Sequence, residues 1–339
     1  MPRAEPRACT APLGWGVIGC GDVVEHKSGP SITAAERSRM AIVMRRNAPA
    51  ARDFARRHAV AEWTDDAAEV VGSAHVDVVY VATPPSSHLQ YVRAAAAAGK
   101  HVLVEKPMAL NAAEARLMVD ACAGAGVQLF VAYYRRFQPH VLRMRELLAA
   151  GAIGRAAHGC ADIAVASVAR AVAAGARPWR ADLVLAGGGW LVDMASHRID
   201  LLVWLLGAVD DAAGVAARYR QDLAVEQSAV AAMRMRCGAL CSVSADFHSG
   251  RDADRFAIHG ACGTLTADPL DGHVVTLATA AASEEIRCTP FPAPHLGLVR
   301  HVERVLLDGA PNQASGAEGM VTETVLDRAV RGRAALVRT

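Results

Sequence analysis

Lysine is nearly absent from this 339-residue chain. Lys27, Lys100 and Lys106 are the only lysines among 36 basic residues, and the others are arginine. Arginine stays protonated at any working pH, whereas a lysine that is buried or lies near other charges can lose its proton and take part in acid–base chemistry. Lys106 follows the apolar run 102–104 and precedes Pro107. We therefore treat it as a candidate catalytic residue, with an ordinary surface lysine as the alternative.

Long apolar runs and a strong net charge are also missing. The apolar segment 199–209 is interrupted by Asp200, and it is far shorter than the roughly 20 residues that a membrane span needs. The N-terminal stretch MPRAEPRACTAP has no apolar run, so we expect neither a signal peptide nor a membrane anchor. The net charge is +2 without a basic stripe rich in aromatics, which argues against a nucleic-acid partner.

Paired metal-binding cysteines are absent as well. The eight cysteines are scattered, and the closest pair, Cys237 and Cys241, has no second pair near it in the sequence. The spacing therefore predicts no metal site. Scattered thiols without a signal sequence are typical of a reducing compartment, so we expect the protein in the cytoplasm.

The first 135 residues alternate strand and helix patterns. Asn111 and Glu114 form a capping box, and Gly99 ends the helix before it. Alternating elements with almost continuously apolar strands favour an α/β Rossmann fold, which is a doubly wound parallel sheet. Strands are predicted at 13–18, 40–44, 76–83, 101–104 and 128–134, and helices at 48–58, 86–98 and 111–124.

From about residue 150 the pattern is that of a C-terminal α+β domain with a mostly antiparallel sheet. A triple glycine, Gly187–Gly189, precedes a predicted helix that ends near residue 206, and helix returns from residue 296. Turn signals separate the strands at hairpin positions. We predict two domains, residues 1–135 and 136–339. The second-domain strands are predicted at 156–168, 213–221, 228–236, 239–247, 254–259 and 273–278.

A glycine turn joins the first strand to the first helix. Gly19 and Gly21 allow the backbone to turn tightly and approach a pyrophosphate, and the helix N-terminus then supplies amide donors. Val24 stands where a third small residue is usual, so the helix must pack on the strand differently. The alternative is a plain turn between core elements. The predicted cofactor contacts in this turn are Gly19, Cys20, Gly21, Asp22 and Val23.

The end of the second strand indicates which dinucleotide binds. An NAD-binding chain normally has an acid there for the ribose 2′-hydroxyl, and this chain has Arg45 and Arg46. Guanidinium groups suit a 2′-phosphate. We therefore favour NADP(H) over NAD(H), and the alternative is that both arginines only lie in solvent at a helix start.

Six motifs together resemble one family, the Gfo/Idh/MocA oxidoreductases, which include glucose-fructose oxidoreductase and inositol dehydrogenase. The matching stretches are VIGCG at 17–21, VATPPSSH at 81–88, EKP at 105–107, AYYRRFQP at 132–139, GGGWLVDMASHRID at 187–200 and SGAEGMVTETVLD at 315–327. The resemblance implies an NAD(P)-binding Rossmann domain followed by an open-faced sheet used for substrate binding and in homodimers or homotetramers. It also implies cofactor contacts from Ala82, Thr83, Pro84, His88, Glu105 and Lys106. Pro85 departs from the family pattern, which usually has asparagine there.

The resemblance implies hydride transfer between NAD(P)(H) and a sugar or cyclic polyol, with 1,5-anhydrofructose reductases as the lead. A dihydrodiol dehydrogenase is an alternative enzyme, and a catalytically silent NADP(H)-binding sensor or scaffold is an alternative of another class. The presence of Lys106, Asp193 and His197 argues against the silent protein.

Lys106, Asp193 and His197 are the predicted catalytic group. Lys106 follows a buried strand at the carboxyl end of the sheet, where open α/β folds bind ligands. Asp193 and His197 are four residues apart on a helix and share a face, and Asp200 lies roughly on that face too. A histidine, with an unperturbed pKa of about 6.5, suits proton transfer near neutral pH. The sequence does not decide between Lys106 and His197 as proton donor. We assign the acid–base role to His197, with Lys106 holding the substrate hydroxyl and Asp193 orienting His197 or binding a hydroxyl.

Aromatic and arginine side chains near this edge are the predicted substrate contacts. They suit stacking on a sugar ring and hydrogen bonding to its hydroxyls, although packing between the domains is the alternative. These residues are Tyr133, Tyr134, Arg136, Trp179 and Arg180, with Arg135 beside them.

Overall fold

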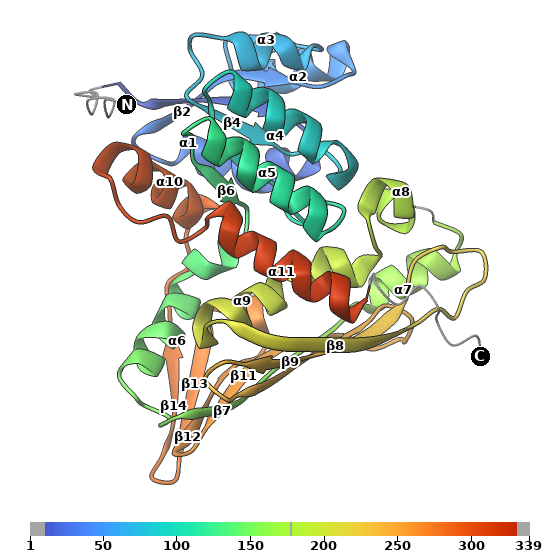
Figure 1. Ribbon diagram of the computed structural model, residues 1–339, viewed down its shortest axis with the longest axis vertical. Helices are drawn as coiled ribbons and strands as arrows, with labels where there is room; N and C mark the ends of the chain where they lie inside the picture. The colour runs from blue at the N-terminus through green and yellow to red at the C-terminus, as the bar shows by residue number, and fades with distance from the viewer. Residues whose placement is uncertain (1–10, 177, 331–339) are drawn as a thin grey trace.

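A parallel six-stranded sheet forms the N-terminal part of the protein in the computed structural model, which describes residues 11–176 and 178–330 (Figure 1). Its strand order is β3-β2-β1-β4-β5-β6, so the order reverses between β1 and β4. Ligands of open α/β sheets bind at the carboxyl ends of strands at such a reversal. The strands are β1 (Leu13–Ile18), β2 (Ser38–Met44), β3 (Glu62–Thr64), β4 (Val78–Val81), β5 (His101–Val104) and β6 (Leu129–Val131).

Helices cover both faces of this sheet, as the sequence predicted. Asn47, Asp66 and Asn111 accept backbone N–H bonds at the starts of three of these helices. The helical segments up to residue 137 are η1 (Val24–Ser28, a π-helix), α1 (Gly29–Thr33), α2 (Ala48–Arg57), α3 (Ala67–Gly72), η2 (Pro85–Ser87), α4 (His88–Ala97), α5 (Ala112–Gly124) and η3 (Tyr134–Phe137). The next helix, α6 (Pro139–Ala149), packs in the core of the second part.

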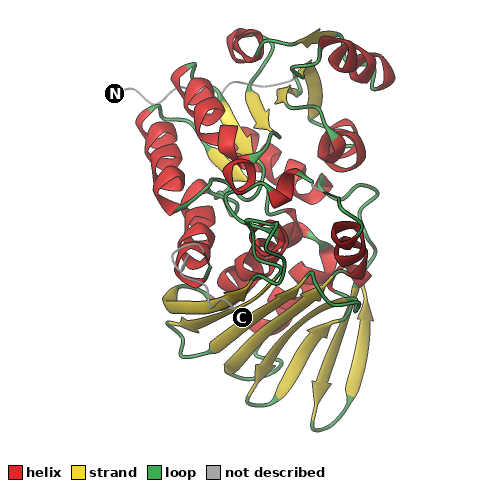
Figure 2. Ribbon diagram, turned by 90° about the vertical axis from the view of Figure 1, so that its right-hand side faces the viewer, coloured by secondary structure: helices red, strands yellow, loops and turns green. Residues whose placement is uncertain are grey.

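An eight-stranded sheet forms the second part, in the order β14-β13-β12-β11-β7-β10-β9-β8. All neighbouring strands are antiparallel except β7 and β10, which are parallel. Figure 2 shows helices on one face of this sheet and none of the drawn helices on the other. The strands are β7 (Ala156–Ala164), β8 (Val209–Ala217), β9 (Ser228–Met235), β10 (Leu240–Asp246), β11 (Ala253–Gly260), β12 (Gly263–Ala267), β13 (Val274–Thr279) and β14 (Ser283–Arg287).

The burial pattern of β9 shows why one face of this sheet is open. Ala229, Ala231, Met233 and Met235 are buried, and the residues between them are exposed. This period of two places one apolar row on the helices and leaves the other face in solvent. The remaining helical segments are α7 (Ala166–Ala173), η4 (Trp179–Ala181), α8 (Leu183–Ala186), η5 (Leu191–Ala195, a π-helix), α9 (Ser196–Leu206), η6 (Leu270–Gly272), α10 (Leu296–Asp308) and α11 (Gly316–Ala329).

The predicted fold class is confirmed, and several predicted strand boundaries are wrong. The predicted strand 128–134 ends at Val131, where a turn leads into η3. The predicted strand 156–168 ends at Ala164, because Val165 precedes the alanine-rich helix α7 and Val168 lies within it. Prediction missed β3, β12 and β14, which are short and lack a clear apolar alternation.

The C-terminal helices pack on elements from both sides of the predicted boundary at residue 135, which stays a prediction. Leu298 and Val302 of α10 share a core with Trp15 and Val17 of β1. Helix α11 lies between α5 and the large sheet (Figure 1). The two parts of the protein are therefore joined by packed helices. No helix in the described part of the chain is both long and apolar enough to cross a membrane.

Candidate active site

The glycine turn after β1 has the geometry that the sequence predicted. Gly19 has a φ of +98°, and a side chain there would lie 2.8 Å from Thr83 and 2.9 Å from the Ala82 carbonyl oxygen. Glycine is therefore required by the protein's own packing at this position. At Gly21 a Cβ would meet only the Gly19 carbonyl oxygen, at 3.9 Å. The backbone at Gly21 thus borders open space, which leaves room for another group to approach it.

Val24 explains how the first helix packs without the usual small residue. Its side chain is fully buried in the core with Trp15, Val17 and Ile32. It begins the π-helical segment η1, and the chain continues as α1. The wider π turn and this valine provide the helix–strand contact that the sequence left unexplained.

Arg45 and Arg46 lie where the ribose of a dinucleotide is expected. Both follow β2 directly and are exposed. Among the described residues, neither side chain has a hydrogen bond or an ion pair. Their guanidinium groups are therefore available for an anionic ligand at the sheet edge.

The loop 82–84 follows β4 at the same edge of the sheet, and its residues are only partly buried. Ala82, Thr83 and Pro84 are half-buried, whereas His88 has no exposed surface. His88 Nε2 lies 2.7 Å from the Thr83 carbonyl oxygen, and Nδ1 lies 3.2 Å from that of Met108. Burial lowers the pKa of His88 to about 4. His88 thus joins this loop to the EKP turn, and the predicted direct cofactor contact does not fit its burial.

Glu105 also points into the protein. Its Oε1 accepts a hydrogen bond from the Tyr80 hydroxyl at 2.6 Å, and its Oε2 accepts from the Lys106 N–H at 3.1 Å. Burial raises the pKa of this carboxyl group. Both carboxylate oxygens of Glu105 are thus used inside the protein, so these hydrogen bonds support a structural role rather than the predicted cofactor contact.

Lys106, which follows β5 of the parallel sheet, contacts Asp193 of η5. Lys106 Nζ donates to Asp193 Oδ1 at 2.6 Å and to the Asp193 carbonyl oxygen at 2.9 Å, and the Lys106–Pro107 peptide bond is cis. Arg180 Nε donates to Asp193 Oδ2 at 2.6 Å. Burial alone would raise the pKa of Asp193, but Lys106 and Arg180 outweigh it and bring the pKa to about 2. Asp193 is therefore an anion held between two cations.

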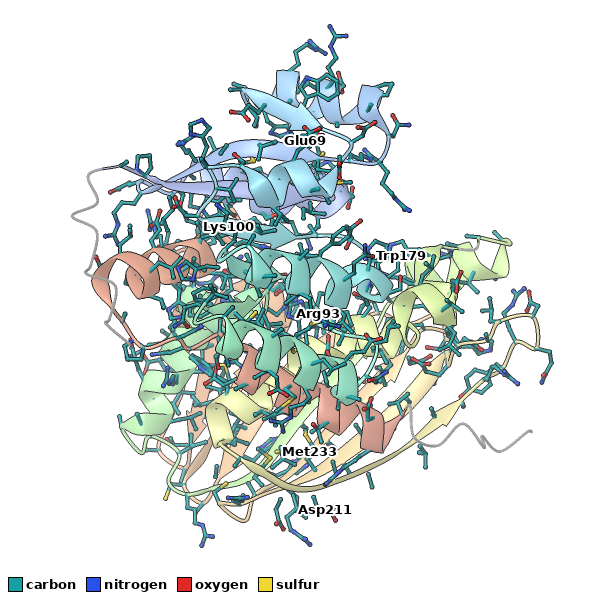
Figure 3. All side chains as sticks on the ribbon, turned by 45° about the horizontal axis from the view of Figure 1, so that its top comes forward. Glu69, Arg93, Lys100, Trp179, Asp211 and Met233 are labelled. Atoms are coloured by element: carbon teal, nitrogen blue, oxygen red, sulfur yellow. The ribbon has the colours of Figure 1, made fainter. Side chains whose placement is uncertain are left out.

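The arginine in this group is stacked on an aromatic ring. The Arg180 guanidinium lies 4.5 Å from the centre of the Trp179 ring. Figure 3 labels Trp179 beside the segment that carries α8. Prediction named both residues as substrate contacts. Trp179 is half-buried, while Arg180 is engaged by Asp193, so any substrate contact of Arg180 stays a prediction.

The triple glycine positions Asp193 in the helix that follows it. Gly187 has a φ of +68°, and a Cβ there would lie 2.9 Å from the Cα of Leu110. Gly189 donates its N–H to Glu226 at 2.9 Å, and a Cβ there would collide with that carboxylate. The triple glycine therefore needs Gly187 and Gly189 to bring η5, which carries Asp193, against the EKP turn.

His197 is buried one turn beyond Asp193 and is surrounded by cations. Burial lowers its pKa well below the usual value, and the charges of Arg135 and Lys106 add to the effect. Its Nδ1 is buried and has no hydrogen-bond partner among the described residues. Both side-chain oxygens of Asp193 are bonded elsewhere, so the predicted orientation of His197 by Asp193 is not seen. His197 is a neutral imidazole near pH 7.

Tyr134 forms the wall beside His197. Its ring lies edge-on to His197 with centroids 5.2 Å apart, and it stacks on His295 at 4.5 Å. The Arg135 guanidinium lies 4.9 Å from the same ring, and Lys27 Nζ lies 5.9 Å from it. Sequence reasoning missed His295 and Lys27 as neighbours of the site. No local motif marks them, because they come from the start of α10 and from η1.

The prediction that Arg136 contacts substrate is wrong, because its side chain is buried and paired inside the protein. It is 1% exposed and forms a two-pronged ion pair with Asp200, at 2.8 and 2.6 Å. Its Nη1 donates to Glu318 and to the Gln313 carbonyl oxygen, both at 2.7 Å. These bonds hold η3, α9 and α11 together. Arg136 and Asp200 therefore have a structural role, because their polar groups are used inside the protein.

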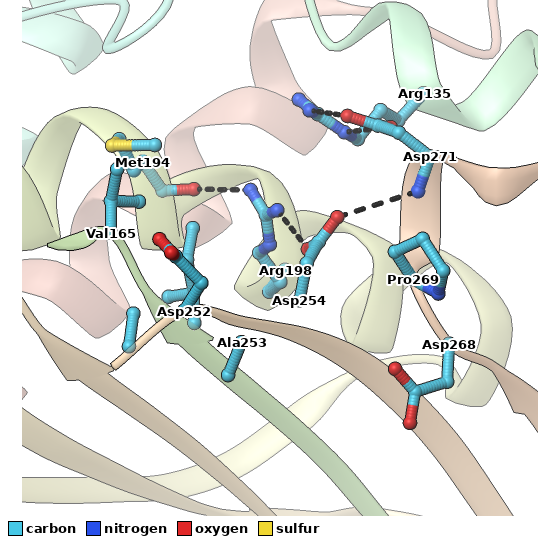
Figure 4. A pocket seen from close by; sticks show the side chains of 12 residues that line it. Arg135, Val165, Met194, Arg198, Asp252, Ala253, Asp254, Asp268, Pro269 and Asp271 are labelled. Atoms are coloured by element: carbon cyan, nitrogen blue, oxygen red, sulfur yellow. Dashed lines mark hydrogen bonds and ion pairs between the residues drawn. The ribbon is translucent and has the colours of Figure 1, made fainter. Parts of the chain in front are cut away.

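A polar hollow of about 450 Å³ lies next to this group, between α9 and the large sheet. Figure 4 shows Arg135 paired with Asp271, and Arg198 paired with Asp254. Asp271 and Asp254 are joined through the Asp271 N–H, at 3.4 Å. The hollow is lined by Arg135, Ile163, Ala164, Val165, Met194, Arg198, Asp252, Ala253, Asp254, Asp268, Pro269 and Asp271.

Comparison with known proteins agrees with this geometry. Residues 13–133 match the family model of the oxidoreductase family with an NAD-binding Rossmann fold, and residues 141–266 match the GFO/IDH/MocA C-terminal domain. Oxidoreductase P35 of Formosa agariphila is 37% identical over 254 residues, which cover 75% of this chain and 78% of that protein. The 1,5-anhydro-D-fructose reductase of Ensifer adhaerens is 29% identical over 340 residues, covering 96% and 98%.

A solved structure shows the same fold over nearly the whole chain. Levoglucosan dehydrogenase in complex with NADH and levoglucosan has a TM-score of 0.86 and 23% identity, and the match covers 96% of this chain and 97% of that one. The matched ranges include both the glycine turn and the helix with Asp193 and His197. The chain is an oxidoreductase that belongs to the GFO/IDH/MocA family.

Proposed function

We propose that the protein transfers hydride between NADP(H) and a sugar or cyclic polyol, with Lys106, Asp193 and His197 at the reacting carbon. The observation that carries this proposal is the contact of Lys106 Nζ with Asp193, at 2.6 Å, beside the neutral and buried His197. A fixed cation and a proton acceptor then lie together at the carboxyl end of the parallel sheet.

The residues at the sheet edge fit a dinucleotide. The open space at Gly21 would admit the pyrophosphate of the dinucleotide. The Arg45 and Arg46 side chains, which are exposed and unpaired among the described residues, would face the 2′-phosphate on the ribose of NADP(H). The loop after β4, with Ala82, Thr83 and Pro84, would contact the dinucleotide from the neighbouring strand end. When bound, the nicotinamide supplies or accepts the hydride.

The charge state of each side chain assigns its role. Lys106 donates a hydrogen bond to the substrate oxygen and stabilises negative charge on it. Asp193 keeps Lys106 in place and, with its low pKa, stays ionised through neutral pH. His197, whose buried ring is unprotonated near neutral pH, accepts the hydroxyl proton when an alcohol is oxidised and returns it when a carbonyl is reduced.

The polar hollow supports a polyol as substrate. Its carboxylates can accept hydrogen bonds from hydroxyl groups, and Arg135 and Arg198 can donate them. A volume of about 450 Å³ lies in the range of small-molecule sites. Arg135 also lies over Tyr134, which links the hollow to the ring beside His197.

The cofactor preference is tested by fluorescence titration with NADPH and NADH. Arg45→Ser and Arg46→Ser should each weaken NADPH binding and leave NADH binding nearly unchanged, because only NADPH carries the 2′-phosphate. Arg93→Ser, at an exposed arginine of α4, is the matched control. Tighter NADH binding by the wild-type protein would refute the preference, and binding of neither nucleotide would refute the proposal.

The substrate class is tested by a panel of sugars, cyclic polyols and aromatic dihydrodiols, read at the nicotinamide absorbance. Turnover of sugars or polyols supports the proposal. Turnover of dihydrodiols alone would make the protein the alternative enzyme, and nucleotide binding without any turnover would favour the silent sensor.

A further inference from the structure

The open face of the large sheet carries a cluster of potential metal ligands away from the proposed active site. His158 and Cys160 lie two residues apart on β7, and His259 lies directly opposite His158 on β11. Side chains two apart on a strand point to the same face, and opposite residues are close neighbours. The ligand atoms of these three residues all lie within 4.8 Å of one another.

The distances in the cluster are near those of a tetrahedral zinc site. Cys160 Sγ lies 3.8 Å from His259 Nε2. Zn–S and Zn–N bonds of about 2.3 and 2.05 Å at a tetrahedral angle place sulfur and nitrogen about 3.6 Å apart. The His158 and His259 rings stack with centroids 5.7 Å apart, and His158 is exposed. A small rotation of this free ring would bring its nitrogen within the same range.

A hydrogen bond orients His259 as a ligand. Its Nδ1 lies 3.0 Å from Thr264 Oγ1, on the neighbouring strand β12. We assign the ring proton to Nδ1, which leaves the Nε2 lone pair facing Cys160. Metal-binding histidines commonly have such a partner on the second ring nitrogen, because it fixes the tautomer and the ring orientation.

We propose that His158, Cys160 and His259 bind a zinc-class divalent cation on the open face of the large sheet. One thiolate and two imidazoles form a donor set that suits Zn²⁺. On binding, the S–H bond of Cys160 breaks, a metal–sulfur bond forms and the proton passes to solvent, with no change of oxidation state. A water molecule completes the tetrahedron. The bound ion links β7 and β11.

The sequence-based prediction of no metal site rested on spacing along the chain. Cys160 and His259 are 99 residues apart, and strand pairing brings them together.

The test is a titration of the metal-free full chain with Co²⁺, followed by displacement with Zn²⁺. We expect about one Co²⁺ per chain, with a thiolate-to-cobalt charge-transfer band and ligand-field bands of tetrahedral intensity. Cys160→Ser should abolish the charge-transfer band. The matched control, Cys237→Ser, removes an exposed cysteine outside the cluster and should leave the band unchanged.

Thr264→Val keeps all three ligands and removes only the partner of His259. It should weaken metal affinity by about 10- to 100-fold, as loss of such partners does in known sites. Circular dichroism of each variant confirms that it is folded. Failure of the wild-type chain to bind Co²⁺, or a charge-transfer band that persists in Cys160→Ser, would overturn the proposal. Neither readout depends on catalysis, so the result stands apart from the proposed function.

Discussion

Replacing Lys106 by methionine removes the cation from the proposed site and keeps a side chain of similar length. The variant loses two hydrogen bonds from Nζ, to Asp193 Oδ1 and to the Asp193 carbonyl oxygen. Asp193 is nearly buried, so the change leaves a carboxylate with one partner, Arg180.

The structure gives a magnitude for each consequence. Breaking a buried ion pair costs about 3–5 kcal/mol of unfolding free energy, and because Asp193 keeps its bond to Arg180, we expect about 3 kcal/mol for Lys106→Met. Turnover should fall by about 10²-fold or more, in line with the loss of a positioned group in proton transfer. NADPH affinity should change little, because Lys106 meets Asp193 rather than the glycine turn.

The assay combines steady-state rates at the nicotinamide absorbance, NADPH titration and thermal unfolding. Lys100→Met is the matched control, since Lys100 Nζ also donates two hydrogen bonds, to the Ser73 and Val76 carbonyl oxygens, at 2.9 and 2.8 Å. It should lower stability and leave the rate per folded molecule unchanged. An unchanged rate in folded Lys106→Met would refute the catalytic role of Lys106.

Three further predictions concern the buried histidines, the Arg136–Asp200 pair and the glycine turn. Stability should fall as the pH drops below about 6.5, because four buried histidines bind protons in that range only after the chain unfolds. Their pKa values are lowered to about 4 for His88, His140 and His301 and to about 3 for His295. Each histidine lowers the unfolding free energy by up to about 1.4 kcal/mol per pH unit, and urea unfolding at pH 7 and pH 5 measures the difference. Asp193, whose pKa is lowered to about 2, loses its contribution to the unfolding free energy only below about pH 4, so it does not affect the range from pH 7 to pH 5. A urea midpoint that stays constant over that range would therefore contradict the histidine assignment. Arg136→Met should destabilise the protein by about 3–5 kcal/mol by leaving Asp200 unpaired in the interior, and Arg136→Met with Asp200→Leu should recover much of the loss; no recovery of the melting temperature in the double variant would refute the pairing. Gly19→Ala should weaken NADPH binding and lower stability, since its Cβ would lie 2.8 Å from Thr83; a variant equal to wild type in both titration and melting would show that the turn tolerates a side chain.

The parts of the fold and the site that could be predicted are those marked by short sequence patterns. The apolar strand before the glycine turn, the EKP turn and the spacing of Asp193 and His197 are all written in short stretches of sequence. Their elements formed because their burial periodicity, caps and glycines agree with one another. The same local signals do not include β14, whose sequence SEEIR is mostly exposed and gains its place from pairing with β13.

Long-range pairing explains what the sequence did not reveal. Arg136 was predicted to face substrate, and its partner Asp200 lies 64 residues away. His295 and Lys27 enter the site from the start of α10 and from η1, and no spacing rule connects them with His197. Asp193 was predicted either to orient His197 or to bind a substrate hydroxyl, and the first role is not seen, because Lys106 and Arg180 occupy both carboxylate oxygens.

The most direct test of the proposed function measures initial rates of NADP⁺ reduction with a panel of sugars and cyclic polyols, for the wild-type protein and for His197→Phe. The Phe ring keeps the contacts with Tyr133 and Tyr134 and removes the proton acceptor. We predict turnover of at least one polyol by the wild-type protein, and a loss of about 10²-fold or more in the variant with NADPH binding retained. Equal rates for the two proteins would contradict the assignment of proton transfer to His197, and no turnover by the wild-type protein despite NADPH binding would contradict the proposed activity.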